Sequence, residues 1–149
     1  MSRSVFVGDH VWIGQEAFIS KGTRIGSGSI IGAKSVTGGK SLPSNCSLAG
    51  VPCKIIKKNI FWLKPSVHSY TADETKKSMR YNKDKYLYHK DDKQIDFDKL
   101  DKAISSSKTS EDMLNCLKEM IFENEDKNRF FIPAEEIKTS LFSKITGKK

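Results

Sequence analysis

The sequence has few of the residues that build disulfide frameworks or metal sites, and it has no long apolar run. It holds 3 histidines and 3 cysteines in 149 residues. Cys46, Cys53 and Cys116 show no CxxC pattern and no spacing shared with histidine, which argues against a cysteine-ligated metal and predicts free thiols in a reduced, cytoplasmic setting. No apolar run approaches about twenty residues and no cationic start precedes an apolar segment, so we expect neither a membrane span nor a secretory signal.

Acidic residues are scarce in the first part of the chain. Residues 1–60 carry eight Lys or Arg against only Asp9 and Glu16, a net charge of +6, whereas residues 61–149 carry eighteen basic and sixteen acidic residues, a net charge of +2. A basic surface suits phosphate groups, either of a nucleic acid or of a phosphorylated cofactor. Charge alone does not choose between these two partners.

A six-residue repeat runs through residues 7–36. Aliphatic residues recur at every sixth position, and a second set of small or apolar residues follows each of them by four positions: Val7, Ile13, Ile19, Ile25 and Ile31, then Val11, Ala17, Thr23, Ser29 and Ser35. Apolar spacing near 3.6 indicates a helix and strict alternation indicates a flat strand. A period of six fits neither, and it is typical of short parallel strands that turn a corner every six residues with one large side chain inward.

Three motifs resemble, in the same order, the closing segment of hexapeptide-repeat acetyltransferases. They are Val7-Gly8-Asp9-His10-Val11-Trp12-Ile13-Gly14, Ile25-Gly26-Ser27-Gly28-Ser29-Ile30-Ile31-Gly32-Ala33 and Ala49-Gly50-Val51-Pro52-Cys53-Lys54-Ile55-Ile56-Lys57. The similarity covers residues 5–62 and is greatest to the branch that acetylates sugars and antibiotics. The resemblance implies a left-handed parallel β-helix, a homotrimer, and transfer of an acetyl group from acetyl-CoA to a sugar hydroxyl or amine, in surface polysaccharide synthesis.

We expect two domains. Residues 1–63 are expected to form a mainly β half, a left-handed parallel β-helix of about two coils with a terminal strand and cap, and residues 64–149 an α-helical extension. Gly38-Gly39 and Pro43 are turn residues, and they predict that coiling stops there. A stack this short exposes an unpaired edge, so we expect the chain to be the C-terminal part of a longer protein or to rely on partner subunits.

The segment after the repeat contains the predicted cap and the predicted helices. The apolar cluster Ile60-Phe61-Trp62-Leu63 is expected to fold back and seal the last coil. Thr71 and Glu74 have capping-box spacing for a helix over residues 71–80, and residues 81–94 read as mostly loop. Further helical faces are expected at Phe97, Leu100 and Ile104, at Met113, Leu114, Leu117, Met120 and Ile121 after a start at Thr109, and at Ile137, Leu141, Phe142 and Ile145 after Pro133.

His10 is the catalytic candidate, because acetyl transfer needs a general base and His10 is the only histidine in the repeat region. Its place three residues after Val7 predicts a side chain that points outward near a corner, where a structural role is the alternative. In the family the base lies upstream of the segment that matches Val7–Gly14, so we expect this chain alone to turn over acetyl-CoA poorly.

The resemblance implies six cofactor-binding positions: Gln15, Ala33, Gly38, Lys40, Lys54 and Lys57. The first two lie on loops that pass the pantetheine arm of CoA, the next two belong to a turn near its adenosine end, and the last two are the basic residues after the Gly-x-Pro turn. CoA carries a pyrophosphate and a ribose phosphate, which call for cations and for backbone amides from tight turns. A solvated cationic edge is the alternative interpretation of the lysines.

Other functions fit the sequence less well. Carbonic anhydrases built from hexapeptide repeats need three imidazole ligands per site, which one histidine in the repeats cannot supply, so we expect no metal. A nucleic-acid surface would interleave basic and aromatic residues, and Trp12, Phe18, Lys21 and Arg24 are too sparse for one. The alternative that stays open is a non-catalytic piece, a trimerising or CoA-binding remnant of a split or truncated transferase.

Overall fold

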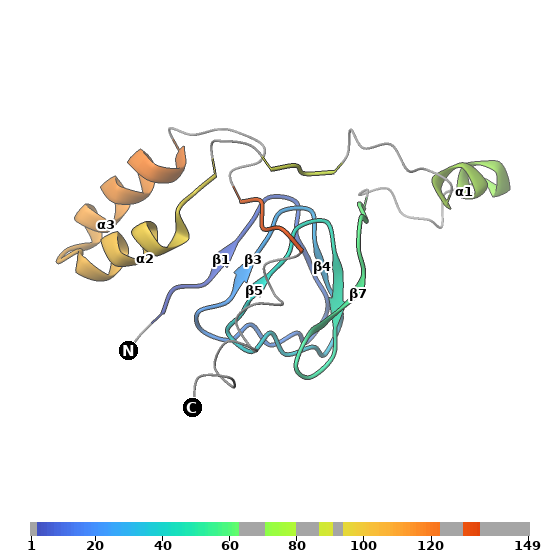
Figure 1. The fold of residues 1–149 in the computed structure, drawn as a ribbon, viewed down its shortest axis with the longest axis horizontal. Coiled ribbons are helices and arrows are strands. Elements are labelled where there is room, and N and C mark those ends of the chain that lie inside the picture. Colours follow the sequence, from blue (N-terminus) through green and yellow to red (C-terminus); the bar gives the residue numbers. More distant parts are fainter. Residues whose placement is uncertain (1–2, 63–70, 80–86, 91–93, 123–129, 135–149) are drawn as a thin grey trace, which may run out of the picture.

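The structure is a computed structural model that describes residues 3–62, 71–79, 87–90, 94–122 and 130–134. Short strands form a three-sided prism, and the helices lie outside it (Figure 1). The strands are β1 (Phe6–Val7), β2 (Trp12–Ile13), β3 (Arg24–Ile25), β4 (Ile30–Ile31), β5 (Ser41–Leu42), β6 (Ser47–Ala49) and β7 (Lys54–Lys57). The helices are α1 (Ala72–Met79), α2 (Phe97–Ser106) and α3 (Ser110–Leu117), with a π-helical turn at Lys118–Phe122.

From β1 to β6, consecutive strands alternate between two sides of the prism. β1, β3 and β5 pair in parallel on one side, called sheet A, and β2, β4 and β6 pair in parallel on a second side, called sheet B. A parallel bridge between Phe18 and Val36 marks the third side. The strands therefore form three rungs: β1 and β2 belong to the first, β3 and β4 to the second, and β5 and β6 to the third. The predicted parallel β-helix followed by α-helices is confirmed.

The prism is taller than the repeat predicts. The pairing of Val7 with Ile25 spans eighteen residues, three repeats of six, whereas the pairing of Ile25 with Leu42 spans seventeen. Gly38 and Gly39 both have left-handed backbone, with φ of 69° and 67°, and they turn the corner with one residue fewer. The prediction that coiling stops there is wrong, because β5 and β6 form a third rung.

Two-residue turns make the corners, and they stack from rung to rung. The first corner holds Asp9–His10, Ser27–Gly28 and Ser44–Asn45; the second holds Gln15–Glu16, Ala33–Lys34 and Gly50; the third holds Lys21–Gly22 and Gly38–Gly39. Non-glycine residues at these turns also take left-handed backbone, among them His10 with φ of 54° and Asn45 with φ of 54°. Each corner therefore depends on a backbone conformation that most residues avoid.

The aliphatic column predicted by the repeat fills the prism. Ile25 and Ile31 are fully buried, and Leu42 and Leu48 continue the column in the third rung. Val7 and Ile13, in the same phase on the first rung, are 42% and 41% exposed. Ile55 of β7 and Ala134 pack against this core. Because β7 joins sheet B beyond β6, the core is covered at the third-rung end and more open at the first.

Buried hydroxyl groups hold the corners. The hydroxyl of Ser29 donates to the carbonyl of Pro43 at 2.6 Å, and the hydroxyls of Thr23 and Thr37 lie 2.7 Å apart. The hydroxyl of Ser35 accepts from the amide of Gly50 at 3.1 Å. These serine and threonine side chains are buried with their hydrogen bonds satisfied, as an interior position requires.

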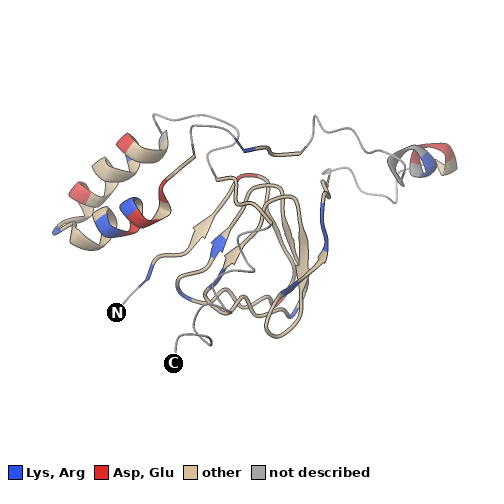
Figure 2. Ribbon diagram, viewed as in Figure 1, with Lys and Arg blue, Asp and Glu red and all other residues tan. Residues whose placement is uncertain are grey.

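α2 attaches to the outer face of sheet A with α3 beside it, whereas α1 lies apart from them, on the other side of the prism (Figure 1). Phe6 of β1 is buried with Ile95, Leu100 and Phe130 in a second hydrophobic cluster. Figure 2 shows that the acidic residues gather on the helices, while the prism carries mainly basic ones. The tail thus shares a core with the first strand, and the boundary between residues 1–63 and 64–149 stays a prediction.

The tail also pairs with the first corner. The amide of Ser44 donates to the carbonyl of Ile132 at 2.8 Å, and the amide of Ile132 donates back to the Ser44 hydroxyl at 3.0 Å. The side chain of Asn45 accepts from the amide of Tyr88 and donates to its carbonyl. Segments far along the sequence therefore complete the hydrogen bonding of the second and third rungs.

The predicted helix starts are confirmed at two places. Glu74 and Thr71 exchange capping hydrogen bonds before α1, and Thr109 forms a capping box with Asp112 before α3. The apolar face expected after Thr109 is only partly buried. Leu117, Met120 and Ile121 pack on the second hydrophobic cluster, while Met113 and Leu114 are exposed. The helix expected after Pro133, and most of the loop expected over 81–94, lie outside the described residues.

Candidate functional site

The second corner brings together two of the predicted cofactor positions. Gln15 lies on the first rung directly above Ala33 on the second, and the amide of Lys34 donates to the carbonyl of Gln15 at 2.9 Å. Both residues are exposed, and within the described part of the chain no protein acceptor receives the backbone N–H of Gln15 or of Ala33. These amides are available to carbonyl groups of a ligand that lies along the corner.

The turn that joins β6 to β7 lies between the second and third corners. Gly50 stacks in the second corner, where the amide of Val36 donates to its carbonyl at 3.0 Å. A Cβ added at Gly38 would lie 3.9 Å from Cβ of Pro52 and 3.9 Å from Cε of Lys40, which places the predicted adenosine-end residues beside the same turn. The structure therefore gathers the second corner, this turn and the third corner along one side of the prism.

The two lysines after the turn lie at opposite ends of β7. Lys54 pairs with Ala49, next to the second corner, and Lys57 pairs with Ser47, toward the first corner. The two lysines are three positions apart along the strand, about 10 Å at the usual rise. Lys40, Lys54 and Lys57 are exposed and belong to neither of the two ion pairs found among the described residues. Lys54 and Lys40 thus flank the turn, and Lys57 lies farther away.

Cys53 is a feature of this turn that sequence reasoning did not single out. It is buried, and burial raises the pKa of its thiol, although a hydrogen bond with Ser35 and the charge of Lys40 oppose the shift. The pKa of the Cys46 thiol is raised by burial as well, against the charge of Lys58. Both side chains are therefore neutral packing groups near pH 7, since only the thiolate is a strong nucleophile.

His10 lies apart from the cofactor positions, at the first corner on the other end of β2. Its ring stacks on the indole of Trp62, with centroids 3.9 Å apart and an interplanar angle of 10°. Nε2 of His10 lies 2.7 Å from the carbonyl oxygen of Trp62, and Nε1–H of Trp62 donates to the carbonyl of His10 at 3.0 Å. The apolar cluster Ile60–Leu63 is expected to seal the last coil. Ile60 does bond to Asn45 on the third rung, but Trp62 lies against the first rung instead.

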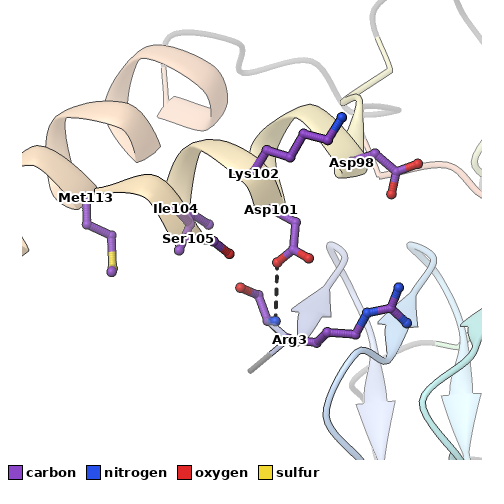
Figure 3. A pocket seen from close by; sticks show the side chains of 8 residues that line it. Arg3, Asp98, Asp101, Lys102, Ile104, Ser105 and Met113 are labelled. Atoms are coloured by element: carbon purple, nitrogen blue, oxygen red, sulfur yellow. Dashed lines mark hydrogen bonds between the residues drawn. The ribbon is translucent and has the colours of Figure 1, made fainter. Parts of the chain in front are cut away.

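Two hollows in the described structure lie away from these residues. One of about 830 Å³ lies between α2 and the segment before β1, and Asp101 there accepts a hydrogen bond from the amide of Ser4 (Figure 3). Another of about 480 Å³ lies at the third-rung end of the first corner and includes Lys58 and His89. Neither is lined by a predicted catalytic or cofactor residue.

No three His, Cys, Asp or Glu side chains in the described ranges are grouped so that they could hold a metal ion. None of the helices described there has both the length and the apolar character needed to cross a membrane.

The repeat segment matches a known family. Residues 4–39 match the profile of the family described as bacterial transferase hexapeptide (six repeats). A search of curated proteins finds no match. The profile ends at the third corner of the second rung, so it covers the first two rungs of the prism and leaves β5, β6, β7 and the helices outside.

Solved structures of acetyltransferases are similar to part of the chain. The polySia-specific acetyltransferase NeuO is 38% identical over 52% of this chain and 35% of that one, with a TM-score of 0.43. The polysialic acid O-acetyltransferase OatWY is 36% identical over 53% and 37%, with a TM-score of 0.42. A maltose O-acetyltransferase from Clostridium difficile 630 is 45% identical over 38% and 29%, with a TM-score of 0.36. The chain spans about a third of the length of these proteins.

Proposed function

We propose that this chain, whose repeat segment belongs to the bacterial hexapeptide transferase family, is the CoA-binding part of an acetyltransferase acting on a sugar hydroxyl or amine. The proposal includes surface polysaccharide as the acceptor class, as the resemblance of the motifs implies. It also includes a homotrimer, in which the cofactor groove lies between neighbouring prisms.

The observation that carries the proposal is the arrangement around the turn between β6 and β7. The amides of Gln15 and Ala33 in the second corner, which have no acceptor among the described residues, lie beside a turn that is flanked by Lys40 and Lys54. Donors and cations along one side of the prism suit the amide carbonyls and the phosphates of CoA, respectively. When bound, acetyl-CoA supplies an activated acetyl thioester. The residues of this chain would bind and orient it.

The proposal is tested by titrating CoA calorimetrically into the wild type and a Lys54→Ala/Lys57→Ala variant. We expect the variant to bind about tenfold more weakly, which corresponds to ~1.4 kcal/mol. The matched control is Lys99→Ala/Lys108→Ala, which removes two exposed lysines from the helical tail and should bind CoA like the wild type. Equal affinity of the Lys54/Lys57 variant and the wild type would contradict the assignment.

A non-catalytic CoA-binding or trimerising piece is the second candidate, and the hydrogen bond between His10 and Trp62 favours it. The Nε2 atom of the only histidine in the repeats is engaged within the chain instead of facing an acceptor. Release of CoA thiol from acetyl-CoA in the presence of sugar acceptors separates the two candidates. A non-catalytic piece binds CoA in the titration above but gives no acceptor-dependent release.

A further inference from the structure

The chain returns along the first corner after β7. Asn59 has left-handed backbone, with φ of 55°, and lies in a bend of the chain. The amide of Ile60 then donates to the carbonyl of Asn45 on the third rung at 2.9 Å, and Trp62 reaches His10 on the first rung. Residues 59–62, called the strap, therefore cross the first corner from the third rung to the first.

The contact between the strap and His10 fixes which ring nitrogen carries a proton. A backbone carbonyl oxygen can only accept a hydrogen bond, so the 2.7 Å contact requires a hydrogen on Nε2 of His10. In the neutral imidazole the lone pair is then on Nδ1. The reciprocal bond from the Trp62 indole to the His10 carbonyl and the stacked rings hold the same geometry.

Two further features make the arrangement rigid. His10 has left-handed backbone, which is uncommon for a residue with a side chain and persists where surrounding contacts hold it. The indole of Trp62 also meets the ring of Trp12 edge to face, with centroids 5.4 Å apart. The strap is therefore held to the first rung by hydrogen bonds to His10 and by two aromatic contacts.

We propose that His10 is a positioning residue whose Nε2–H holds the strap across the first corner, and that the ring can accept a proton only at Nδ1 while the strap is in place. The proposal deepens the function proposed above and rests on it for any role in acetyl transfer. It replaces an acid–base role at Nε2, the nitrogen that the strap engages.

The experiment is NMR of the full chain labelled with ¹⁵N-histidine, recorded above the histidine pKa range. His10 is expected to show the Nε2–H tautomer with an exchange-protected Nε2–H signal, assigned by its absence in His10→Asn. In Trp62→Ala that protection should be lost, and the Ile60 amide should exchange about fivefold faster, as expected for the loss of one ordinary hydrogen bond. Trp62→Phe keeps the stacked ring and should retain most of the protection, and Lys58→Ala, at the exposed residue directly before the strap, is the matched control.

The outcomes separate this proposal from the proposed function. An Nδ1–H tautomer, or an Nε2–H signal that Trp62→Ala leaves unchanged, would overturn the role of the strap. Calorimetry of CoA with Trp62→Ala should give the wild-type affinity, because Gln15, Ala33 and Lys54 lie at the second corner. A wild type that shows the protected Nε2–H but binds no CoA would leave the strap intact and reject the cofactor site.

Discussion

Arg24 connects a strand of the prism to the helical tail through a single side chain. Its guanidinium lies over the ring of Phe97, 5.3 Å from the centroid, and forms an ion pair with Asp98 at the start of α2. The hydrogen bond from Arg24 lowers the pKa of Asp98, the charge of Arg24 adds to this, and Lys102 and Arg3 contribute less. Arg24, whose side chain points outward from β3, thus attaches the tail to the prism.

We expect this ion pair to stabilise the protein modestly and only when Asp98 is ionised. Because the pKa of Asp98 is lower in the folded chain than its usual value near 4, the contribution is complete above that value and disappears as the pH falls through the lowered pKa. Asp98 is largely exposed, so a double-mutant cycle with Arg24→Met and Asp98→Asn should give a coupling of about 0.2–1 kcal/mol at pH 7. A coupling that does not weaken as the pH is lowered below about 4 would contradict this account.

Single residues differ in how far the sequence reveals their roles. The spacing of Ile25 and Ile31 predicts their burial, because a period of six leaves one inward position per strand. The same spacing places His10 outward, which is also observed. It cannot indicate that Trp62 would lie against His10, because that contact joins residues fifty-two positions apart and depends on the direction in which the strap turns.

At the scale of the strand, the distance between rungs explains the glycine that follows four of the five aliphatic residues of the repeat. A Cβ added at Gly26 would lie 2.4 Å from Oγ and 2.6 Å from N of Ser44 on the next rung. An added Cβ at Gly14 would lie 2.5 Å from N of Ala33. The obstacle in each case includes backbone, which cannot rotate away. Glycine at this position permits the close stacking of the corners.

Gly26→Ala is therefore expected to destabilise the prism by about 1–3 kcal/mol, the usual cost of forcing a methyl group into a packed site. The measurement is the midpoint of urea unfolding, followed by circular dichroism. Ser41→Ala serves as the control, because Ser41 is an exposed residue of β5 and its replacement should change stability by less than about 0.5 kcal/mol. An unchanged midpoint for Gly26→Ala would show that the rungs can separate locally.

Elements with strict periodicity were predictable, and those that shift phase were not. β1 to β4 follow the period of six, as do the third-side positions Phe18 and Val36. β5 and β6 escaped prediction because the double glycine at the third corner shortens the second coil by one residue, which moves Leu42 and Leu48 out of phase. The capping boxes before α1 and α3 were predictable because they are local. The docking of α2 on Phe6 was not, since it joins distant parts of the chain.

At the scale of the whole molecule, the described part of the tail covers one side of the prism and leaves the other two exposed. Sheet A is covered by α2 through Phe6 and Arg24. Trp12 on sheet B is 52% exposed and Phe18 on the third side is 64% exposed. Large exposed apolar side chains of this kind are typical of association surfaces. The proposed homotrimer would use these two sides.

We expect the wild type to have three times the monomer mass by light scattering coupled to size-exclusion chromatography. Phe18→Glu should shift the protein toward monomers, because it places a charge where an apolar contact between prisms is proposed. Leu114→Glu is the matched control: Leu114 is also exposed, at 46%, but it lies on α3 and its replacement should leave the mass unchanged. A monomeric wild type, or a trimer unaffected by Phe18→Glu, would reject the use of the third side.

The bonds between Ser44 and Ile132 have a consequence for biosynthesis. The two residues are separated by eighty-eight positions, and the amide of Ser27 likewise depends on the carbonyl of Phe130. Translation delivers the N-terminal rungs first, so the nascent prism emerges from the ribosome with these amides still bonded to water. The first corner reaches its final hydrogen bonding only after residues 130–132 have been synthesised.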